Sequence, residues 1–155
     1  MRHRGILRAG LLVLALPSVV LGVWITIAPR SFYDDFPGGG RHWVSALPPY
    51  NEHLLRDFGS ANLTIAIVLI GAAIVLESRF VQVTLLAYIV GTLAHLGYHL
   101  TTTGHYSSGD NIASLGGFAV ELLLAVALLV LTRQLARASE APPPAASSHS
   151  PTSRS

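Results

Sequence analysis

The chain has 155 residues, of which 51% are hydrophobic and only 12% are charged. Soluble globular domains carry roughly 25% charged residues, so this composition is typical of an integral membrane protein and argues against an independent soluble enzyme domain. The sequence has no cysteine, which excludes disulfides, thiolate metal sites and cysteine nucleophiles. All ten basic residues are arginines scattered near the ends of apolar segments, and this distribution argues against nucleic acid as a partner.

The first apolar segment, residues 6–28, predicts a membrane-spanning helix. It is longer than the 7–15-residue apolar core of a secretory signal peptide, so we expect it to be retained; cleavage near Ala28 is the alternative. Pro17 is expected to kink this helix without ending it, because neighbouring helices can satisfy the carbonyl that proline leaves free.

Residues 29–50 are predicted to form an outer loop at the membrane interface. The loop has a Gly38–Gly40 hinge and is rich in aromatic residues: Phe32, Tyr33, Phe36 and Trp43. Aromatic side chains are common at the level of the lipid headgroups, so we interpret them as interfacial anchors; the alternative is that they gate access for a ligand.

The second helix is predicted over residues 51–76. Asn51 suits the N-cap, and Glu52 then lies at the positive end of the helix dipole. Arg56 follows Glu52 by four residues, a spacing that predicts a surface ion pair at the helix mouth.

A tight turn at Glu77–Arg79 leads to a third helix, predicted over residues 80–100, and Asp110 or Asn111 is expected to cap a fourth, residues 112–131. The fold class is therefore all-α, a four-transmembrane-helix bundle within residues 1–132. The remaining residues, 133–155, contain three consecutive prolines followed by serines and predict a disordered tail.

The arginines predict the orientation in the plasma membrane. With both termini cytoplasmic, seven arginines fall on the inner side and three, Arg30, Arg41 and Arg56, on the outer side. An excess of arginine marks the cytoplasmic side, so we expect a multi-pass protein with cytoplasmic N- and C-termini.

Two stripes of polar residues follow the predicted second and third helices. Each stripe steps by four, three and four residues, which places its members on one helix face: His53, Asp57, Ser60 and Thr64; Tyr88, Thr92, His95 and His99. Because the two helices are antiparallel, we expect the histidines and Asp57 to meet in the outer half of the bundle. On the fourth helix Glu121 lies about 14 Å from the helix start, near the membrane middle and the level of Tyr88 and Thr92.

Imidazoles and a carboxylate are ligands of transition metals. We therefore predict that His53, Asp57, His95 and His99 bind a metal ion such as zinc, iron or copper. Haem b held by His53 with His95 or His99 is an alternative cofactor. His105, in the outer loop, is a candidate additional ligand, and Glu121 is a deeper proton-carrying or hydrogen-bonding partner.

Two further functions remain open. Polar groups inside a membrane also join helices, so the chain can instead be a non-enzymatic assembly subunit whose polar stripes hold helices together. In that interpretation Asp57 pairs with His53 or Arg56. Glu121 would alternatively serve a proton-coupled carrier of small molecules.

No GxSxG, P-loop or HExxH motif is present, so the sequence indicates no reaction. Beyond the lipid bilayer, the candidate partners are a second copy of the chain or another membrane protein.

The segment Pro49–Gly59, with its PYNEHLLRD motif, precedes the His95-x-x-x-His99 motif of the next helix. In these two motifs the chain resembles a group of small four-helix membrane proteins from actinobacteria, which are similar in organisation to the DoxX-like membrane proteins. The resemblance covers about residues 6–131. It implies a four-helix membrane bundle and carries over no catalytic residue.

Overall fold

The computed structural model describes residues 2–47 and 49–140, which are mostly helical, with one short hairpin and an irregular segment that leads from it to the next long helix. Four of the helices are long and apolar enough to cross a membrane: α1, α3, α4 and α5. The expected all-α fold with four such helices is confirmed. In chain order the elements are α1 (Arg2–Ile27), α2 (Pro29–Asp35), β1 (Pro37–Gly38), β2 (Arg41–His42), α3 (Glu52–Val75), α4 (Ser78–Thr101), the 3-10 turn η1 (Thr103–His105) and α5 (Ser108–Glu140).

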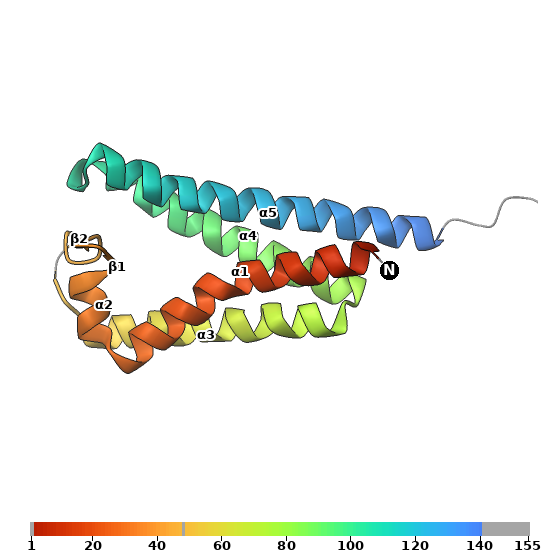
Figure 1. The fold of residues 1–155 in the computed structure, drawn as a ribbon, viewed down its shortest axis with the longest axis horizontal. Coiled ribbons are helices and arrows are strands. Elements are labelled where there is room, and N and C mark those ends of the chain that lie inside the picture. Colours follow the sequence, from red (N-terminus) through yellow and green to blue (C-terminus); the bar gives the residue numbers. More distant parts are fainter. Residues whose placement is uncertain (1, 48, 141–155) are drawn as a thin grey trace, which may run out of the picture.

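The long helices form two pairs that run along one axis (Figure 1). Helix α1 packs mainly on α3, and α4 packs mainly on α5. The start of α1 and the end of α5 lie at one end of the bundle, here called the terminal end (Figure 1). Helix α2 and the hairpin lie at the opposite end, here called the loop end.

The hydrophobic core joins all four helices only in the terminal half. Leu11, Leu69, Leu85 and Ala125, one from each long helix, are completely buried in a single cluster. The core cluster of the loop half is smaller and is built around Ile25, Phe32 and Leu55, with partners from α1, α2, α3 and the segment between them. The two helix pairs are therefore tied together at one end and less closely packed at the other.

Two glycines allow α1 and α3 to pack closely. A Cβ atom on Gly22 would lie 2.9 Å from the backbone nitrogen of Leu63, and one on Gly59 would lie 3.0 Å from Cγ2 of Ile25. Small residues at helix contacts let two backbones approach, which is a common way for membrane helices to associate. This contact fixes which face of α3 is turned towards α1.

The predicted cap of α3 is confirmed, whereas the cap of α5 is a different residue. The Asn51 side chain accepts a hydrogen bond from the Leu54 backbone N–H at 3.1 Å, as expected. At α5 the Ser107 hydroxyl accepts from the Asp110 N–H at 3.1 Å, and the helix begins at Ser108. Neither Asp110 nor Asn111 is the cap, because a serine three residues before Asp110 provides a better start: its hydroxyl bonds both the backbone and the side chain of Asp110.

The connection between α3 and α4 is shorter than predicted. Leu76 has a positive φ of 53°, which ends α3, and Glu77 caps α4 directly. The Glu77 carboxylate accepts hydrogen bonds from the Arg79 and Phe80 N–H groups at 2.9 and 2.7 Å. These bonds lower the pKa of Glu77 because they stabilise the charged carboxylate.

Two other boundaries differ from the prediction. Helix α5 continues to Glu140 instead of ending near Leu131, so residues 133–140 are helical. The Arg, Gln, Leu and Ala residues there favour helix, and the first proline comes only at Pro142. The rest of the predicted tail lies outside the described residues. The expected irregular loop 29–50 contains α2, because Pro29 suits a first helical position and Phe32 finds a buried site.

Candidate functional site

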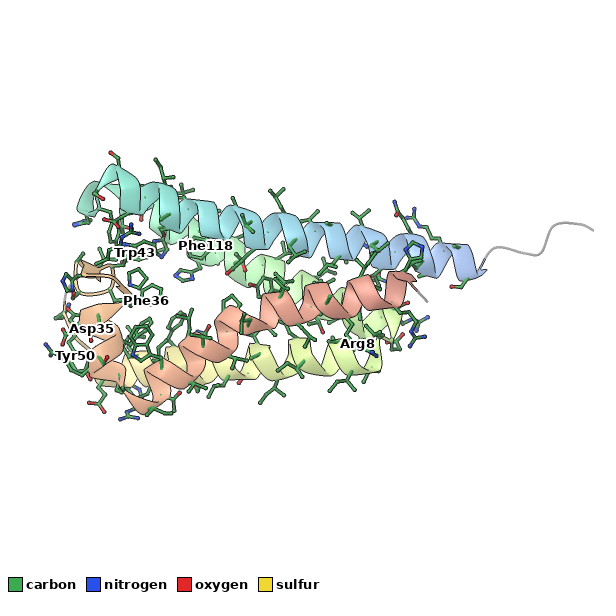
Figure 2. The ribbon with its side chains drawn as sticks, viewed as in Figure 1. Arg8, Asp35, Phe36, Trp43, Tyr50 and Phe118 are labelled. Carbon is green, nitrogen blue, oxygen red and sulfur yellow. The ribbon has the colours of Figure 1, made fainter. Side chains whose placement is uncertain are left out.

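A cavity of about 1140 Å³ lies between the two helix pairs. We call it the loop-end cavity; it is lined by parts of all four long helices, α2 and the segment around Trp43. Figure 2 shows Phe36, Trp43 and Phe118 around this space. Aromatic residues are prominent in the lining: Phe32, Tyr33, Phe36, Trp43, Phe58, Tyr88, Tyr98, Tyr106 and Phe118. Small-molecule sites have volumes of roughly 300–1,000 Å³, so the cavity is large enough for such a ligand.

The path of α1 helps to keep the cavity open. Pro17 lies inside α1 and has no N–H to donate to the preceding turn. The helix changes direction along its length, and its second half follows α3 away from α5 (Figure 1). Pro17 and Ser18 both line the cavity. Pro17 therefore lies where the four-helix core ends and the two helix pairs separate.

At the loop end of the cavity, the segment around the hairpin is hydrogen-bonded to α5. The Trp43 indole N–H donates to the Asp110 carboxylate at 2.8 Å, and the Tyr106 hydroxyl donates to the Trp43 carbonyl at 2.7 Å. Arg41 lies 3.5 Å from the same carboxylate, and the Phe36 ring packs edge-on against Trp43. Burial raises the pKa of Tyr106. The aromatic residues of the predicted loop, Phe32, Tyr33, Phe36 and Trp43, therefore line the cavity; their position at a membrane interface stays a prediction.

His95 and His99 lie side by side on the α4 wall of the cavity. Their Nε2 atoms are 3.2 Å apart. The ring of Phe118 on α5 contacts both imidazoles, with centroid distances of 4.9 and 5.1 Å. Phe58 of α3 packs edge-on against His95 at 5.9 Å. The histidine pair is thus held within an aromatic frame and faces the cavity.

Tyr88 and Glu121 form a second polar pair on the same wall. The Tyr88 hydroxyl donates to Oε2 of Glu121 at 2.9 Å, and Tyr88 is only 7% exposed. Thr92 is buried on the same helix, one turn from Tyr88. This contact confirms the prediction that Glu121 lies at the level of Tyr88. Tyr88, Thr92, His95, His99 and Glu121 therefore share one cavity.

His53 and Asp57 are not brought to this site. Their side chains are 89% and 63% exposed, and they contact each other at 3.4 Å on the outer face of α3. The Ser60 and Thr64 hydroxyls of the same stripe bond backbone carbonyls of α3 itself. The stripe faces outward because Leu55, Gly59 and Ala66 are buried against the rest of the bundle. The contact between His53 and Asp57 is the pairing expected in the packing interpretation, but the bonds of this stripe all stay within α3 and join it to no other helix of the described chain.

The predicted metal shell of four residues is therefore not gathered at one place. Within residues 2–47 and 49–140, no three His, Asp or Glu side chains come together in a group that could hold a metal ion. His53 does not line the cavity, so the structure does not pair it with His95 or His99 around a haem. What remains together from the predicted shell is the pair His95 and His99.

Glu52 and His105 also lie outside the cavity lining. The Glu52 carboxylate is 2.8 Å from the Arg56 guanidinium, which confirms the predicted ion pair at the mouth of α3. The Tyr50 hydroxyl donates to the same carboxylate at 3.2 Å. His105 is exposed in η1. Neither residue belongs to the polar side chains of α4 and α5 that line the cavity.

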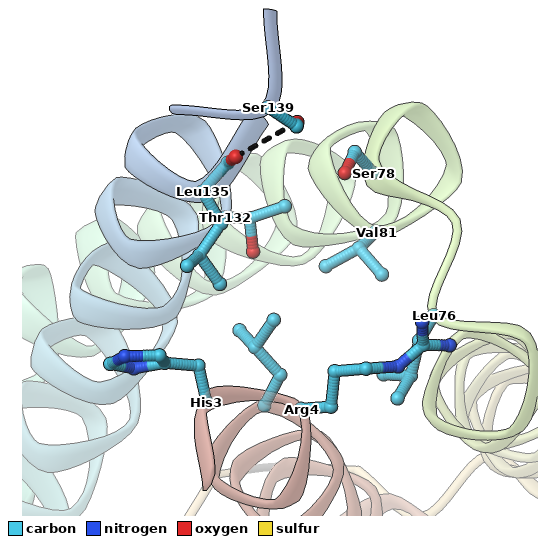
Figure 3. A pocket seen from close by; sticks show the side chains of 9 residues that line it. His3, Arg4, Leu76, Ser78, Val81, Thr132, Leu135 and Ser139 are labelled. Carbon is cyan, nitrogen blue, oxygen red and sulfur yellow. Dashed lines mark hydrogen bonds between the residues drawn. The ribbon is translucent and has the colours of Figure 1, made fainter. Parts of the chain in front are cut away.

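A second hollow, of about 290 Å³, lies at the terminal end between α1, α4 and α5. Figure 3 shows His3 and Arg4 of α1 on one side of it, with Ser78, Val81 and Thr132 across the opening. The Thr132 hydroxyl is occupied by a bond to the Leu128 carbonyl at 2.7 Å. None of the residues singled out in the sequence as a candidate ligand lines this hollow.

Comparison with known proteins gives no match to a family model, a curated protein or a solved structure. The resemblance to the DoxX-like group remains a prediction.

Proposed function

We propose that the chain is an integral membrane protein whose four long helices span the plasma membrane with both termini in the cytoplasm. The outward faces of these helices support this proposal, because large apolar side chains are exposed on each of them: Val13, 58%; Ile67, 71%; Val90, 66%; Leu123, 71%. Such faces need an apolar environment. The terminal end also carries more described arginines than the loop end, in line with the rule for cytoplasmic loops.

Within this protein the loop-end cavity binds a small amphipathic molecule, one with a polar head and an apolar body. The observation that carries this proposal is the division of the lining. Polar groups lie together on α4 and α5: Tyr88, Thr92, His95, His99 and Glu121. Across from them the lining from α1, α2, α3 and the loop is mostly apolar and aromatic. A few polar groups in a mostly apolar cavity are what fixes the orientation of a small ligand.

Tryptophan fluorescence tests this proposal, because the chain has two tryptophans and only Trp43 lines the cavity. In Trp24→Phe protein, where Trp43 alone reports, a brominated long-chain alcohol should quench fluorescence with a saturable titration curve. In Trp43→Phe protein, the remaining Trp24 should show only weak quenching that rises linearly with concentration. Linear curves of equal slope in both variants would mean that the probe dissolves in the surrounding detergent and does not enter the cavity.

A second candidate is that His95 and His99 together hold one transition metal ion. Two imidazole nitrogens that bind a tetrahedral ion at 2.0–2.1 Å are separated by about 3.4 Å, and the Nε2 atoms of this pair are 3.2 Å apart. The open cavity beside them leaves room for water or a ligand in the remaining positions. Such a site would be an open one, able to bind a substrate.

Metal analysis of detergent-purified protein tests this second candidate. Wild-type protein is expected to retain about one equivalent of metal, and His95→Ala and His99→Ala should each lose it, because the single imidazole that remains cannot hold the ion alone. His53→Ala is the matched control on the outer face of α3 and should keep the metal. Metal content that is absent from wild type, or equal in all four proteins, would remove the candidate, and an absorption spectrum would reveal haem by its Soret band.

A further inference from the structure

The charge of the loop-end cavity is asymmetric. Glu121 is the one acidic residue among the described residues that line it, and no arginine is part of this lining. The three arginines at the loop end are already paired with carboxylates: Arg30 with Asp34 at 2.6 Å, Arg41 with Asp110 at 3.5 Å and Arg56 with Glu52 at 2.8 Å. No arginine at the loop end is therefore left to neutralise the Glu121 carboxylate, and the two basic side chains of the lining, His95 and His99, contact each other through Nε2 atoms that are 3.2 Å apart.

The hydrogen bond from Tyr88 leaves one carboxylate oxygen of Glu121 available for another partner. Tyr88 donates its hydroxyl to Oε2, and Oε1 has no hydrogen-bond partner among the described residues. Because the Tyr88 hydroxyl is a neutral donor, it holds the carboxylate in position without cancelling its charge. Glu121 also lines the cavity, so this oxygen is accessible to a ligand from inside the bundle.

The remaining walls suit a cation as well. Nine aromatic side chains line the cavity: Phe32, Tyr33, Phe36, Trp43, Phe58, Tyr88, Tyr98, Tyr106 and Phe118. The faces of aromatic rings attract cations within about 6 Å, and organic ammonium groups are commonly recognised by such rings. Phe118, three residues before Glu121 on α5, shares its helix face and also lines the cavity.

We propose that the ligand of the loop-end cavity is a lipophilic organic cation, whose charge pairs with Glu121 and whose apolar groups pack against the aromatic lining. This proposal rests on the proposed function, since it names the chemical class of the amphipathic molecule. Glu121 supplies the charge for binding, and Tyr88 positions it. An anion of the same shape would meet the same aromatic surface but would be repelled by the carboxylate.

Tetraphenylphosphonium and tetraphenylborate test the charge preference, because they have nearly the same size and shape and opposite charge. Equilibrium dialysis of the full chain in detergent, corrected for binding to empty micelles, should show saturable binding of tetraphenylphosphonium. Tetraphenylborate should bind at least about tenfold more weakly. Removing one partner of a buried charge pair commonly lowers affinity by more than tenfold, so Glu121→Gln should weaken tetraphenylphosphonium binding by at least about that factor.

Two further variants control this experiment. Glu52→Gln removes a carboxylate at the same end of the bundle but outside the cavity, and should leave tetraphenylphosphonium binding unchanged. Glu121→Asp keeps the charge and should retain more binding than Glu121→Gln. The comparison of the two ions on wild-type protein needs no variant, so a folding defect cannot obscure it.

The outcomes separate the two proposals. Equal affinity for the two ions, or an unchanged affinity in Glu121→Gln, would overturn the cation proposal even if the brominated alcohol still quenches Trp43 saturably. A failure of saturable quenching would instead overturn the cavity function itself. Binding of tetraphenylphosphonium that falls as much in Glu52→Gln as in Glu121→Gln would show a general surface effect and would also contradict the cation proposal.

Discussion

Replacing Gly117 by phenylalanine is expected to abolish the saturable quenching of Trp43, whereas the same replacement at Gly116 leaves it intact. Gly117 lines the loop-end cavity and Gly116 does not. A Cβ atom added at either position meets nothing within 4 Å, so neither change forces the helices apart. At position 117 the new ring would occupy space that the ligand needs.

The pair of variants is closely matched. Both lie on α5, at adjacent positions, and both exchange a glycine for the same residue, which gives the same gain in helix propensity. The titration with brominated alcohol in the Trp24→Phe background measures the difference directly. Saturable quenching that survives in Gly117→Phe, or that is lost equally in both variants, would contradict binding inside the cavity.

The second large effect concerns the contact between α1 and α3. Gly22→Leu is expected to destabilise the protein by about 3 kcal/mol, at the upper end of the usual cost of overpacking. The new Cβ would lie 2.9 Å from the Leu63 backbone nitrogen, so a backbone and not only a side chain must move. Thermal unfolding in detergent, followed by circular dichroism, measures this change.

Gly97→Leu is the control for this prediction. Gly97 lies in α4 and a Cβ there meets nothing within 4 Å. This variant should be as stable as wild type or more stable by up to about 1 kcal/mol, because glycine is a poor helix former. Equal unfolding temperatures for Gly22→Leu and Gly97→Leu would show that α1 and α3 do not pack through Gly22.

Much of the fold is readable from local sequence signals. Apolar runs of suitable length predict the four long helices, because each helix needs a continuous apolar surface. The Asn51 cap and the ion pair between Glu52 and Arg56 depend on residues only three or four positions apart, and both are confirmed. The level of Glu121 relative to Tyr88 follows from the rise per residue, and the contact between the two side chains confirms it. Helix α5 begins at Ser108, before the predicted start at residue 112, so Glu121 lies farther from the helix start than predicted.

Local sequence signals could not show in which direction the polar residues of α3, His53 and Asp57 among them, would face. Periodicity shows that His53 and Asp57 share a helix face but not which neighbour, if any, that face meets. The choice is made by packing: Gly59 lets α3 approach α1, and this contact turns the opposite face outward. Such a preference depends on the shapes of two helices together and leaves no signal in the spacing of polar residues.

The aromatic residues that contact the histidine pair, Phe58 and Phe118, were also not predicted to be part of the site. Phe118 lies three residues before Glu121, so it shares the face of that carboxylate and could have been found by the same spacing argument. The bond between Trp43 and Asp110 joins residues 67 positions apart and has no local signal. The contact between the hairpin segment and α5 therefore becomes visible only in the folded chain.

Native mass spectrometry with a brominated long-chain alcohol is the most direct test of the central claim that the loop-end cavity binds an amphipathic molecule. The claim predicts one bound molecule per chain in wild-type and Gly116→Phe protein, and none in Gly117→Phe protein. The same distribution of bound molecules in all three proteins would contradict it.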